Sequence, residues 1–197
     1  MTIVTLASQS GTRAAIMKNA GIPFEIEASN VDEDEAKRGF LARGLAPIDI
    51  ASGLAELKAV TVSKTRPGLV IGADQTLDVS GVLVDKAESL DEARERLIAL
   101  RGRVHALHAG LAVAQKGAIV WRRTQSARLT MRRFSDHFLD GYLSRNGDRI
   151  LSSVGCYHLE GEGVQLFEKI EGDYFTILGL PLFGLLEFLR DAGVVAV

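Results

Sequence analysis

The sequence predicts an α/β fold with a sheet of mixed strand direction. Short apolar runs that suit buried strands alternate along the chain with segments of helical spacing. Two strand-rich segments around Lys116-Gly117 also indicate a long hairpin, which makes some neighbouring strands antiparallel. Because no linker is long or polar enough to separate independent units, we expect a single domain over residues 1–197.

The N-terminal segment is predicted to form a strand, a helix and a second strand. An apolar run at residues 3–7 predicts a buried strand. Helical character begins at Arg13, after a polar turn, and ends at Gly21, a residue type that suits the end of a helix. Residues 22–28 then alternate apolar and polar side chains, which is the period of a half-buried strand.

The next segment is predicted to form a loop, a helix and a strand. We expect the acidic run at residues 32–35 to lie in the loop. Pro47 suits the first turn of a helix, and Pro67-Gly68 ends that helix. The apolar run at 69–72 predicts a second buried strand, which is expected to end at Ala73-Asp74.

The rest of the chain carries clear boundary signals. The expected elements are a tight turn at Ser80-Gly81 between short strands, a helix over 90–100 with Ser89 as N-cap and Glu92 completing a capping box, hairpin strands over 104–114 and 119–131, a helix from Ser135 to Leu143, and a helix over 182–189 after Pro181. Strands and helices are therefore interleaved to the end of the sequence.

Composition and charge restrict the class of protein. Of the 197 residues, 47% are hydrophobic and 24% are charged, which is typical of a folded domain and excludes a disordered chain. Lys and Arg number 23 against 25 Asp and Glu, so the net charge of −2 argues against nucleic acid held by a basic face. The single cysteine, Cys156, cannot form an intrachain disulfide, and no apolar run reaches the ~18 residues of a membrane helix. We expect a cytoplasmic protein whose partners include neither a nucleic acid polymer nor a membrane.

The polar turn after the first strand is the first candidate site. Ser8, Ser10 and Arg13 lie where a buried strand gives way to a helix, whose free N–H groups and partial positive charge attract phosphate. Serine hydroxyls and an arginine would complete an anion-binding cradle. The serines could instead serve only to cap the helix, and this segment by itself does not distinguish the two roles.

Asp74 is the second candidate. It follows an apolar run and lies at the expected carboxyl end of a buried strand, where ligands gather in open α/β sheets; the alternative is a turn-forming role. Lys58 and Lys86 each suit an exposed surface, yet with Arg13 and Asp74 they suit a site for a polyphosphate and a divalent cation. The acidic run at 32–35 adds oxygen ligands of the kind that Mg²⁺ prefers, or else forms a solvated loop.

Several short motifs occur in a characteristic order along the chain. They are Leu6-Ala7-Ser8 with Ser10 and Arg13, Val31-Asp32-Glu33, Lys58-Ala59, Gly72-Ala73-Asp74, Lys86, Gly155-Cys156-Tyr157 and Gly179-Leu180-Pro181. This ordered set resembles the Maf family of nucleoside triphosphate pyrophosphatases. The resemblance runs from Leu6 almost to Val194. Each motif alone is short, but their order is specific to the family.

The resemblance implies an elongated central sheet flanked by helices, with two lobes around a cleft, as in Maf and ITPase-like proteins. It also implies hydrolysis of a nucleoside triphosphate between its α- and β-phosphates, with Asp74 activating the water. Glu33 and Asp74 would bind a divalent cation, Mg²⁺ or Mn²⁺, and the chain would form a homodimer. The substrate-binding residues that the resemblance implies are Ser8, Ser10, Thr12, Arg13, Lys58, Gln75, Lys86 and Glu160.

Two positions bear on the choice of nucleobase. Gln75 follows Gly-Ala-Asp and Glu160 lies in the late glycine-rich segment, which resembles the 7-methyl-GTP type of the family; the dTTP/UTP type has Thr and Gln there. A carboxylate accepts both N–H groups on the Watson–Crick edge of guanine, and the positive charge of 7-methylguanine strengthens that pairing. We therefore expect a modified guanine nucleotide as substrate, with the dTTP/UTP type as the alternative.

Four positions depart from the family pattern. Gly11 stands where the family usually has proline, and Thr12 where it has arginine or an aromatic residue. Asp85 and Ala87 flank Lys86, where the family has Gly-Lys-Pro. Asp85 adds a negative charge near the expected phosphate site, which would weaken substrate binding or alter the metal requirement. Asp85 and Thr12 therefore allow an alternative, a nucleotide-binding regulator of cell division that does not hydrolyse its ligand. Another is a serine or cysteine hydrolase that uses Ser8 or Cys156.

Overall fold

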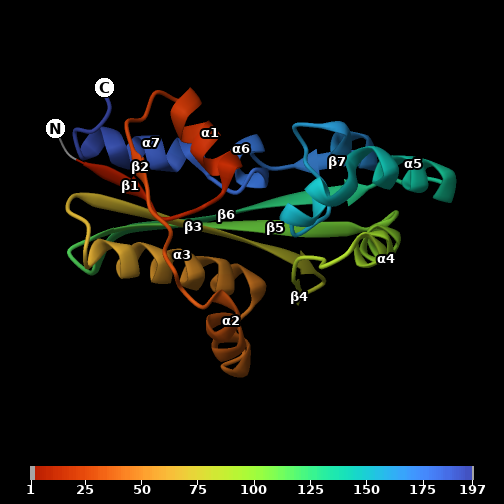
Figure 1. The fold of residues 1–197 in the computed structure, drawn as a ribbon, viewed down its shortest axis with the longest axis horizontal. Helices are drawn as coiled ribbons and strands as arrows, with labels where there is room; N and C mark the ends of the chain where they lie inside the picture. Colours follow the sequence, from red (N-terminus) through yellow and green to blue (C-terminus); the bar gives the residue numbers. More distant parts are fainter. Residues whose placement is uncertain (1–2, 197) are drawn as a thin grey trace.

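One sheet of mixed direction forms the centre of the molecule. The computed structural model describes residues 3–196, and within them strands pair in the order β2-β1-β3-β5-β6-β7, with β4 joined to β3 beside this path (Figure 1). The strands are β1 (Val4–Leu6), β2 (Glu25–Ile26), β3 (Leu69–Val79), β4 (Val82–Val84), β5 (Val104–Gln115), β6 (Ala118–Met131) and β7 (Phe167–Glu171). β1 runs parallel to β2 and β3 and the other pairs are antiparallel, which confirms the predicted mixed sheet.

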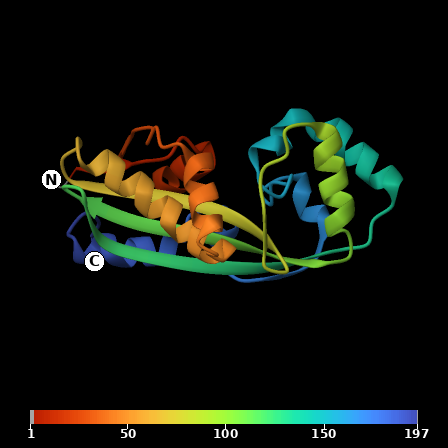
Figure 2. The same ribbon diagram turned by 90° about the horizontal axis from the view of Figure 1, so that it is seen from below.

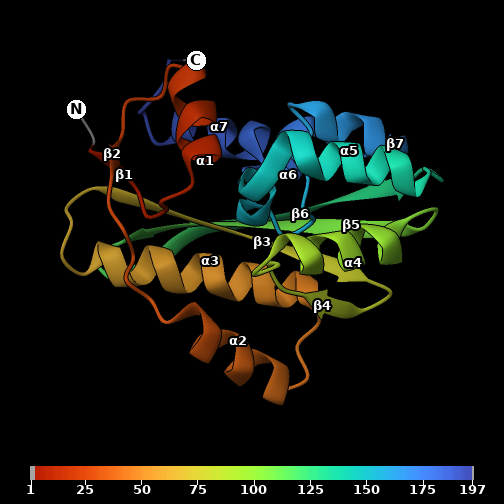
Figure 3. The same ribbon diagram turned by 45° about the vertical axis from the view of Figure 1, so that its right-hand side comes forward.

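Helices cover both faces of the sheet. They are α1 (Gly11–Asn19), α2 (Glu33–Ala42), α3 (Pro47–Ser63), α4 (Leu90–Leu100), α5 (Asp136–Asn146), α6 (Tyr174–Ile177) and α7 (Leu182–Asp191). α2 and α3 lie on one face, and α1, α6 and α7 lie on the other, as Figures 1 and 3 show. No helix within residues 3–196 combines the length and the apolar composition that crossing a membrane requires.

The long strands β3, β5 and β6 connect two lobes. One lobe contains α1, α2, α3 and α7; the other contains α4, α5 and the 3₁₀ helices Gly147–Ser152 and Glu162–Leu166 (Figure 2). Each lobe has its own buried apolar cluster: Leu6 and Leu185 belong to the first, Leu97 and Tyr142 to the second. The elongated sheet with two lobes is the fold that the sequence resemblance predicts.

Glycines in the strands let α3 lie directly on the sheet. A Cβ at Gly72 in β3 would come within 2.1 Å of the Ala55 carbonyl oxygen, and one at Gly110 in β5 within 2.3 Å of the Ala51 oxygen. Glycine is needed at both strand positions, because any side chain would push the helix away. This close contact sets the distance between α3 and β3, and therefore what Lys58 of α3 can reach.

β3 continues well beyond its expected end at Ala73-Asp74. It runs to Val79, because β5 pairs with it without interruption from Val70 to Asp78. This pairing outweighs the local tendency of Asp74 to form a turn. Asp74 is therefore a mid-strand residue, and the prediction that the strand ends there is wrong.

The acidic run begins a helix instead of lying in a loop. Asp32 caps α2, and its carboxylate accepts a hydrogen bond from the Glu35 amide at 2.8 Å. The acidic residues that follow lie in the first turn, where negative charge suits the helix dipole.

The strand expected over 22–28 is only two residues long, β2, because only this pair reaches the neighbouring β1.

Most other boundaries agree with the sequence prediction. Ser80 and Lys116 each begin a tight turn with positive φ and are followed by a glycine that also has positive φ, as two-residue hairpins require. Ser89 and Ser135 act as N-caps of α4 and α5 through their hydroxyls. β7 and α6 are additional short elements that carry no clear periodic signal.

Candidate active site

The candidate site lies where one edge of β3 has no strand partner. β1 pairs with β3 only as far as Ile71, and β4 pairs with the same edge only from Leu77 onward, while β5 occupies the opposite edge. Within this open stretch, Asp74, Gln75 and Thr76 line a cleft of about 550 Å³ that both lobes line. The cleft exists because β1 is short and β3 is long, and Asp74 lies in the middle of the open stretch.

Ser8 and Ser10 lie in the turn that leads from β1 into α1. Ser10 is the N-cap of α1, and its hydroxyl accepts a hydrogen bond from the Arg13 amide at 3.4 Å. The Ser8 hydroxyl accepts hydrogen bonds from the Ser10 amide at 3.3 Å and from Arg13 Nη1 at 3.1 Å. Ser10 thus has the capping role, while Ser8 positions the arginine, and both line the cleft.

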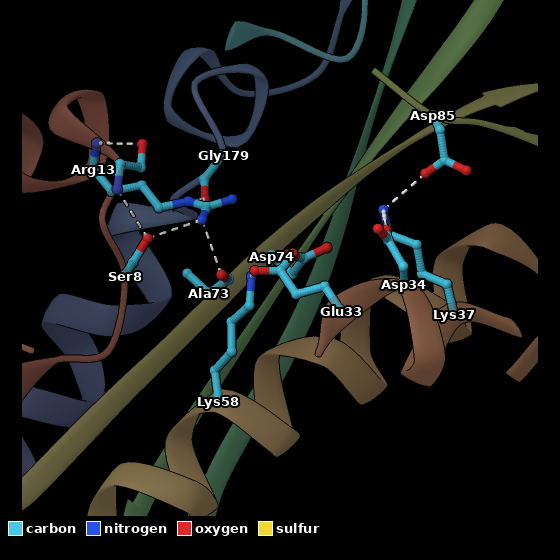
Figure 4. A network of polar contacts seen from close by, with 11 residues as sticks. Ser8, Arg13, Glu33, Asp34, Lys37, Lys58, Ala73, Asp74, Asp85 and Gly179 are labelled. Carbon is cyan, nitrogen blue, oxygen red and sulfur yellow. Dashed lines mark hydrogen bonds and ion pairs between the residues drawn. The ribbon is translucent and has the colours of Figure 1, made fainter. Parts of the chain in front are cut away.

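The Arg13 guanidinium is held by neutral oxygen atoms. Nη1 donates to the Ala73 carbonyl oxygen at 2.9 Å as well as to Ser8, and Nε donates to the Gly179 carbonyl oxygen at 2.9 Å (Figure 4). Burial lowers the pKa of Arg13, while the charges of Asp74 and Glu33 act to raise it. An arginine side chain stays protonated in proteins, so this positive charge is available to an anionic ligand.

Lys58 joins the two acidic residues that are expected to bind a metal. Its Nζ lies 2.6 Å from Asp74 Oδ1 and 2.9 Å from Glu33 Oε1 (Figure 4). Lys58 and Asp74 are buried, whereas the Glu33 side chain is 44% exposed. Capping by Asp32 makes Glu33 the first residue of α2, which sets its side chain beside α3. Three elements thus contribute one charged group each to this cluster.

A divalent cation fits the two carboxylates. Mg²⁺ takes oxygen ligands and is commonly held by one or two protein carboxylates together with substrate phosphates. Within residues 3–196, no group of three or more His, Cys, Asp and Glu side chains is placed to hold a metal ion. Glu33 and Asp74 would therefore supply two of the ligands, and phosphate and water oxygens would have to supply the others.

Lys37 of α2 is a further cation that lines the cleft. Its Nζ lies 2.8 Å from Asp85 Oδ1 and 3.6 Å from Asp34 Oδ1. Burial acts to lower the pKa of Lys37, but the hydrogen bond to Asp85 and the surrounding carboxylates raise it above its ordinary value. The negative charge of Asp85 is therefore matched by an ammonium group.

Lys86, which follows Asp85 in the sequence, is exposed in the cleft without a hydrogen-bond or ion-pair partner in the described part of the chain.

Gln75 of β3 and Glu160 also line the cleft. Gln75 Nε2 donates hydrogen bonds to the carbonyl oxygens of Thr176 and Ile177, at 3.0 and 2.9 Å, so this amide holds α6 against β3. Its carbonyl oxygen has no hydrogen-bond partner among residues 3–196. Glu160 is exposed in the cleft and has no partner among residues 3–196, whereas nearby Glu162 is engaged in an ion pair.

All ten residues that the sequence predicts for the site line this one cleft. They are Ser8, Ser10, Thr12, Arg13, Glu33, Lys58, Asp74, Gln75, Lys86 and Glu160. Ion pairs join Lys58 to both acids, while Thr12, Lys86 and Glu160 share the cleft without touching that cluster. Sequence reasoning missed Lys37. Its signal is its place one helical turn after Glu33, which shows only once the acidic run is recognised as a helix start.

The two candidate nucleophiles lack the contacts that covalent catalysis needs. Cys156 is fully buried, and burial raises the pKa of its thiol, which disfavours the reactive thiolate. Ser8 is hydrogen-bonded to Arg13, and in the described residues no histidine accepts its proton. A serine or cysteine nucleophile is activated by an adjacent base, by a lowered pKa or by a metal ion. The geometry therefore favours a site that binds an anion over one that forms a covalent intermediate.

Comparisons with known proteins find relatives along the whole chain. The family model described as "Maf-like protein" matches residues 3–192. A Caulobacter vibrioides protein named nucleoside triphosphate pyrophosphatase is 62% identical over 197 residues, which cover 100% of this chain and 99% of the relative. A Rhizobium meliloti protein named 7-methyl-GTP pyrophosphatase is 44% identical over 194 residues, 98% of each chain. Among solved structures, a HAM1 protein from Coxiella burnetii is 17% identical with a TM-score of 0.45, and the match covers 68% of this chain and 75% of that one.

Proposed function

This chain belongs to the Maf-like protein family, and from that membership we propose that it is a nucleoside triphosphate pyrophosphatase. The reaction cleaves the bond between the α- and β-phosphates with water and yields a nucleoside monophosphate and pyrophosphate. The names of relatives at 62% and 44% identity support this activity. The structural observation that carries it is the convergence of Arg13, Lys58 and Lys86 on the cleft that contains Asp74.

The charges in the cleft support a substrate that arrives with a divalent cation. Four basic side chains line the cleft, and they are matched by the four acidic side chains Glu33, Asp74, Asp85 and Glu160. A triphosphate would add several negative charges to this balanced set. A bound Mg²⁺ or Mn²⁺ offsets such charge and acts as a Lewis acid on phosphate oxygens. We therefore propose that Glu33 and Asp74 hold the cation.

Asp74 is the group that we propose as the general base. Lys58 binds Oδ1, and Oδ2 has no hydrogen-bond partner among residues 3–196, so Oδ2 can accept a proton from water. Loss of that proton turns the water into a better nucleophile toward phosphorus. The electron pair of the broken bond leaves on pyrophosphate, and the cations Arg13, Lys58 and Lys86 stabilise the charge that develops there.

A panel of nucleotides tests the proposed activity. Purified protein would be incubated with ordinary and methylated nucleoside triphosphates, in the presence of Mg²⁺, Mn²⁺ or a chelator, and pyrophosphate would be measured. We expect release with at least one nucleotide and one cation, and no release with the chelator. Tight nucleotide binding without release from any member of the panel would instead favour the non-hydrolysing regulator.

One of the two features that allow that regulator is the negative charge of Asp85, which would repel phosphate at the site. In the structure, Asp85 is ion-paired with Lys37 at 2.8 Å, and Lys86 beside it is free to bind phosphate. The departure from the family pattern at position 85 is therefore compatible with hydrolysis.

We propose a 7-methylated guanine nucleotide as the preferred substrate, and the dTTP/UTP type as the alternative. The exposed carboxylate of Glu160 supports this choice, because it is free to accept two N–H groups from a guanine edge. The variant Glu160→Gln should lower kcat/KM for 7-methyl-GTP by about tenfold or more, since one accepting oxygen becomes a donor. The same variant should affect UTP less. Equal losses for both nucleotides would remove Glu160 from base selection.

The assembly and location of the protein are further parts of the proposal. Resemblance to the family supports a homodimer, and sedimentation velocity would distinguish it from a monomer. The buried free thiol of Cys156 suits a reducing compartment, so we place the reaction in the cytoplasm.

A further inference from the structure

A single ammonium group holds both carboxylates that are proposed to bind the metal. Lys58 Nζ lies 2.6 Å from Asp74 Oδ1 and 2.9 Å from Glu33 Oε1, and the lysine side chain is only 7% exposed. Figure 4 shows the ammonium beside the two acids, with Arg13 approaching from the other side of the cleft. Another cation that uses these same oxygens has to compete with Lys58.

Lys58 cannot simply withdraw into solvent. Ala55 and Ala59 on the same helix are fully buried against the sheet, which holds the backbone of α3 in place. An ammonium that loses its partners in a buried position is strongly unfavourable unless it finds another anion. Among residues 3–196, Asp74 and Glu33 are the carboxylates that pair with it. The adjoining cleft has room for an anion, and a phosphate would offer several acceptor oxygens.

We infer that Lys58 is an internal counter-ion, which takes the place of the divalent cation until an anionic substrate enters the cleft. The substrate phosphates then accept the ammonium, and the carboxylates of Asp74 and Glu33 become free for the metal. The identity of that anion rests on the proposed function, whereas the competition between Lys58 and a metal ion does not. As a consequence, the nucleotide-free protein binds a divalent cation weakly.

The other cations of the cleft cannot play this part. Arg13 is hydrogen-bonded to neutral oxygens, and Lys37 is paired with Asp85, away from Lys58. Lys86 has no carboxylate partner in the described residues. Lys86→Gln is therefore a matched control, because it removes one positive charge from the same cleft without touching either carboxylate.

Binding of Mn²⁺ to the nucleotide-free protein tests the inference. The free ion would be measured by electron paramagnetic resonance in the parent protein, in Lys58→Gln and in Lys86→Gln. The glutamine amide can still donate a hydrogen bond to Asp74, which helps the variant to fold. We expect Lys58→Gln to bind Mn²⁺ about tenfold more tightly than the parent or better, and Lys86→Gln to change the affinity by less than about threefold.

Failure of Lys58→Gln to gain affinity for Mn²⁺ would overturn the inference. If Lys58→Gln binds Mn²⁺ no more tightly than the parent or Lys86→Gln, the counter-ion role is wrong. Lys58→Met is a second neutral variant to be measured if the glutamine variant does not fold. Adding Glu33→Gln to Lys58→Gln should abolish the gain, and persistence of the gain would overturn the assignment to this pair. No turnover enters these measurements, so protein that binds Mn²⁺ as expected but hydrolyses no triphosphate would contradict the proposed function alone.

Discussion

Asp74 depends on neighbours from two other elements and on the path of its own strand. Lys58 of α3 binds one of its oxygens, and the start of α2 brings Glu33 to the same ammonium. The open stretch of β3 directs the carboxylate into the cleft. A buried acid with one bonded oxygen and one free oxygen is arranged for proton transfer, whereas the turn-forming role would need it at a strand end.

The variant Asp74→Asn should retain the fold and lose most of the activity. Asparagine has the same size and keeps an oxygen that can accept the hydrogen bond of Lys58, but its amide cannot take a proton from water. We expect the rate of pyrophosphate release to fall by about 10²–10⁴-fold, the usual contribution of a positioned base. Asp78→Asn is the matched control, because Asp78 lies on the same face of β3 outside the cleft. Release by Asp74→Asn at the parental rate would leave Asp74 with a structural role.

His105 makes stability depend on pH. It is buried between Tyr157 and Phe167, its Nε2 lies 2.7 Å from the Tyr157 hydroxyl, and Nδ1 has no partner in the described residues. Burial lowers its pKa to about 4, compared with about 6.5 in an unfolded chain. Between these values the unfolded state binds more protons, so the free energy of unfolding falls as the pH is lowered from about 6.5 toward 4.

We expect His105 to reduce the free energy of unfolding by about 2 kcal/mol between pH 7.5 and pH 5. Urea denaturation at the two pH values would measure this difference. Replacing His105 with Leu should flatten the pH dependence, because the titrating group is gone. His137→Gln is the control, since it removes an exposed histidine and keeps His105. An unchanged slope in His105→Leu would assign the effect to other groups.

At the scale of elements, the packing of α3 on the sheet both stabilises the fold and positions Lys58 in the site. Its small residues pack against Gly72 and Gly110, and its Lys58 reaches Asp74 from this position. Thr76 adds a tie at the helix start, where its hydroxyl donates to the Pro47 carbonyl oxygen at 2.8 Å. Any displacement of α3 from the sheet therefore moves Lys58 away from the carboxylates.

Gly72→Ala should destabilise the protein and lower its activity together. The new Cβ would lie 2.1 Å from the Ala55 oxygen, a backbone atom that cannot move without moving α3. We expect a loss of about 1–3 kcal/mol in the free energy of unfolding, which is typical of overpacking. Gly39→Ala in α2 is the control, because a Cβ there would meet no atom within 4 Å outside its own helix. Alanine there should be neutral or stabilise by up to about 1 kcal/mol. Equal stability of the two variants would mean that α3 is not held by this contact.

At the scale of the whole molecule, two apolar cores share one sheet. Trp121 packs against the core of the first lobe and is stacked on Phe188, whereas Leu97 is buried in the core of the second lobe. β3, β5 and β6 enter both lobes, so unfolding one lobe would leave half of each long strand without its packing partners. We therefore expect the lobes to unfold together as one domain.

A substitution in the core of one lobe should also lower the stability of the other lobe. Leu97→Ala should lower the free energy of unfolding by about 2–5 kcal/mol, as loss of a buried leucine usually does. Urea denaturation would be followed both by Trp121 fluorescence and by far-ultraviolet circular dichroism. If the chain is one cooperative unit, the substitution should lower the denaturation midpoint by the same amount with both signals. A fluorescence midpoint that stays at the parental value would show that the lobes unfold independently.

Local sequence signals were sufficient for many boundaries. The hairpin turn at Ser80-Gly81 and the capped start at Ser89 depend on residues within a few positions, so both are readable from the chain. The resemblance to the family named ten site residues, and all ten are among the residues that line the cleft. Their catalytic and binding roles remain predictions that the experiments above address.

The sequence by itself determined the alternation of strands and helices and the positions of many caps and turns, because these depend on residues close together in the chain. Only the tertiary structure decided that β3 continues through Asp74. The strand that pairs with β3 there is β5, and β4 and α4 separate the two strands along the chain. The tertiary structure also decided that one ammonium, Lys58, is shared by Glu33 and Asp74, and that Lys37 neutralises Asp85. These facts depend on contacts between residues far apart in sequence, and such contacts exist only after the elements have packed.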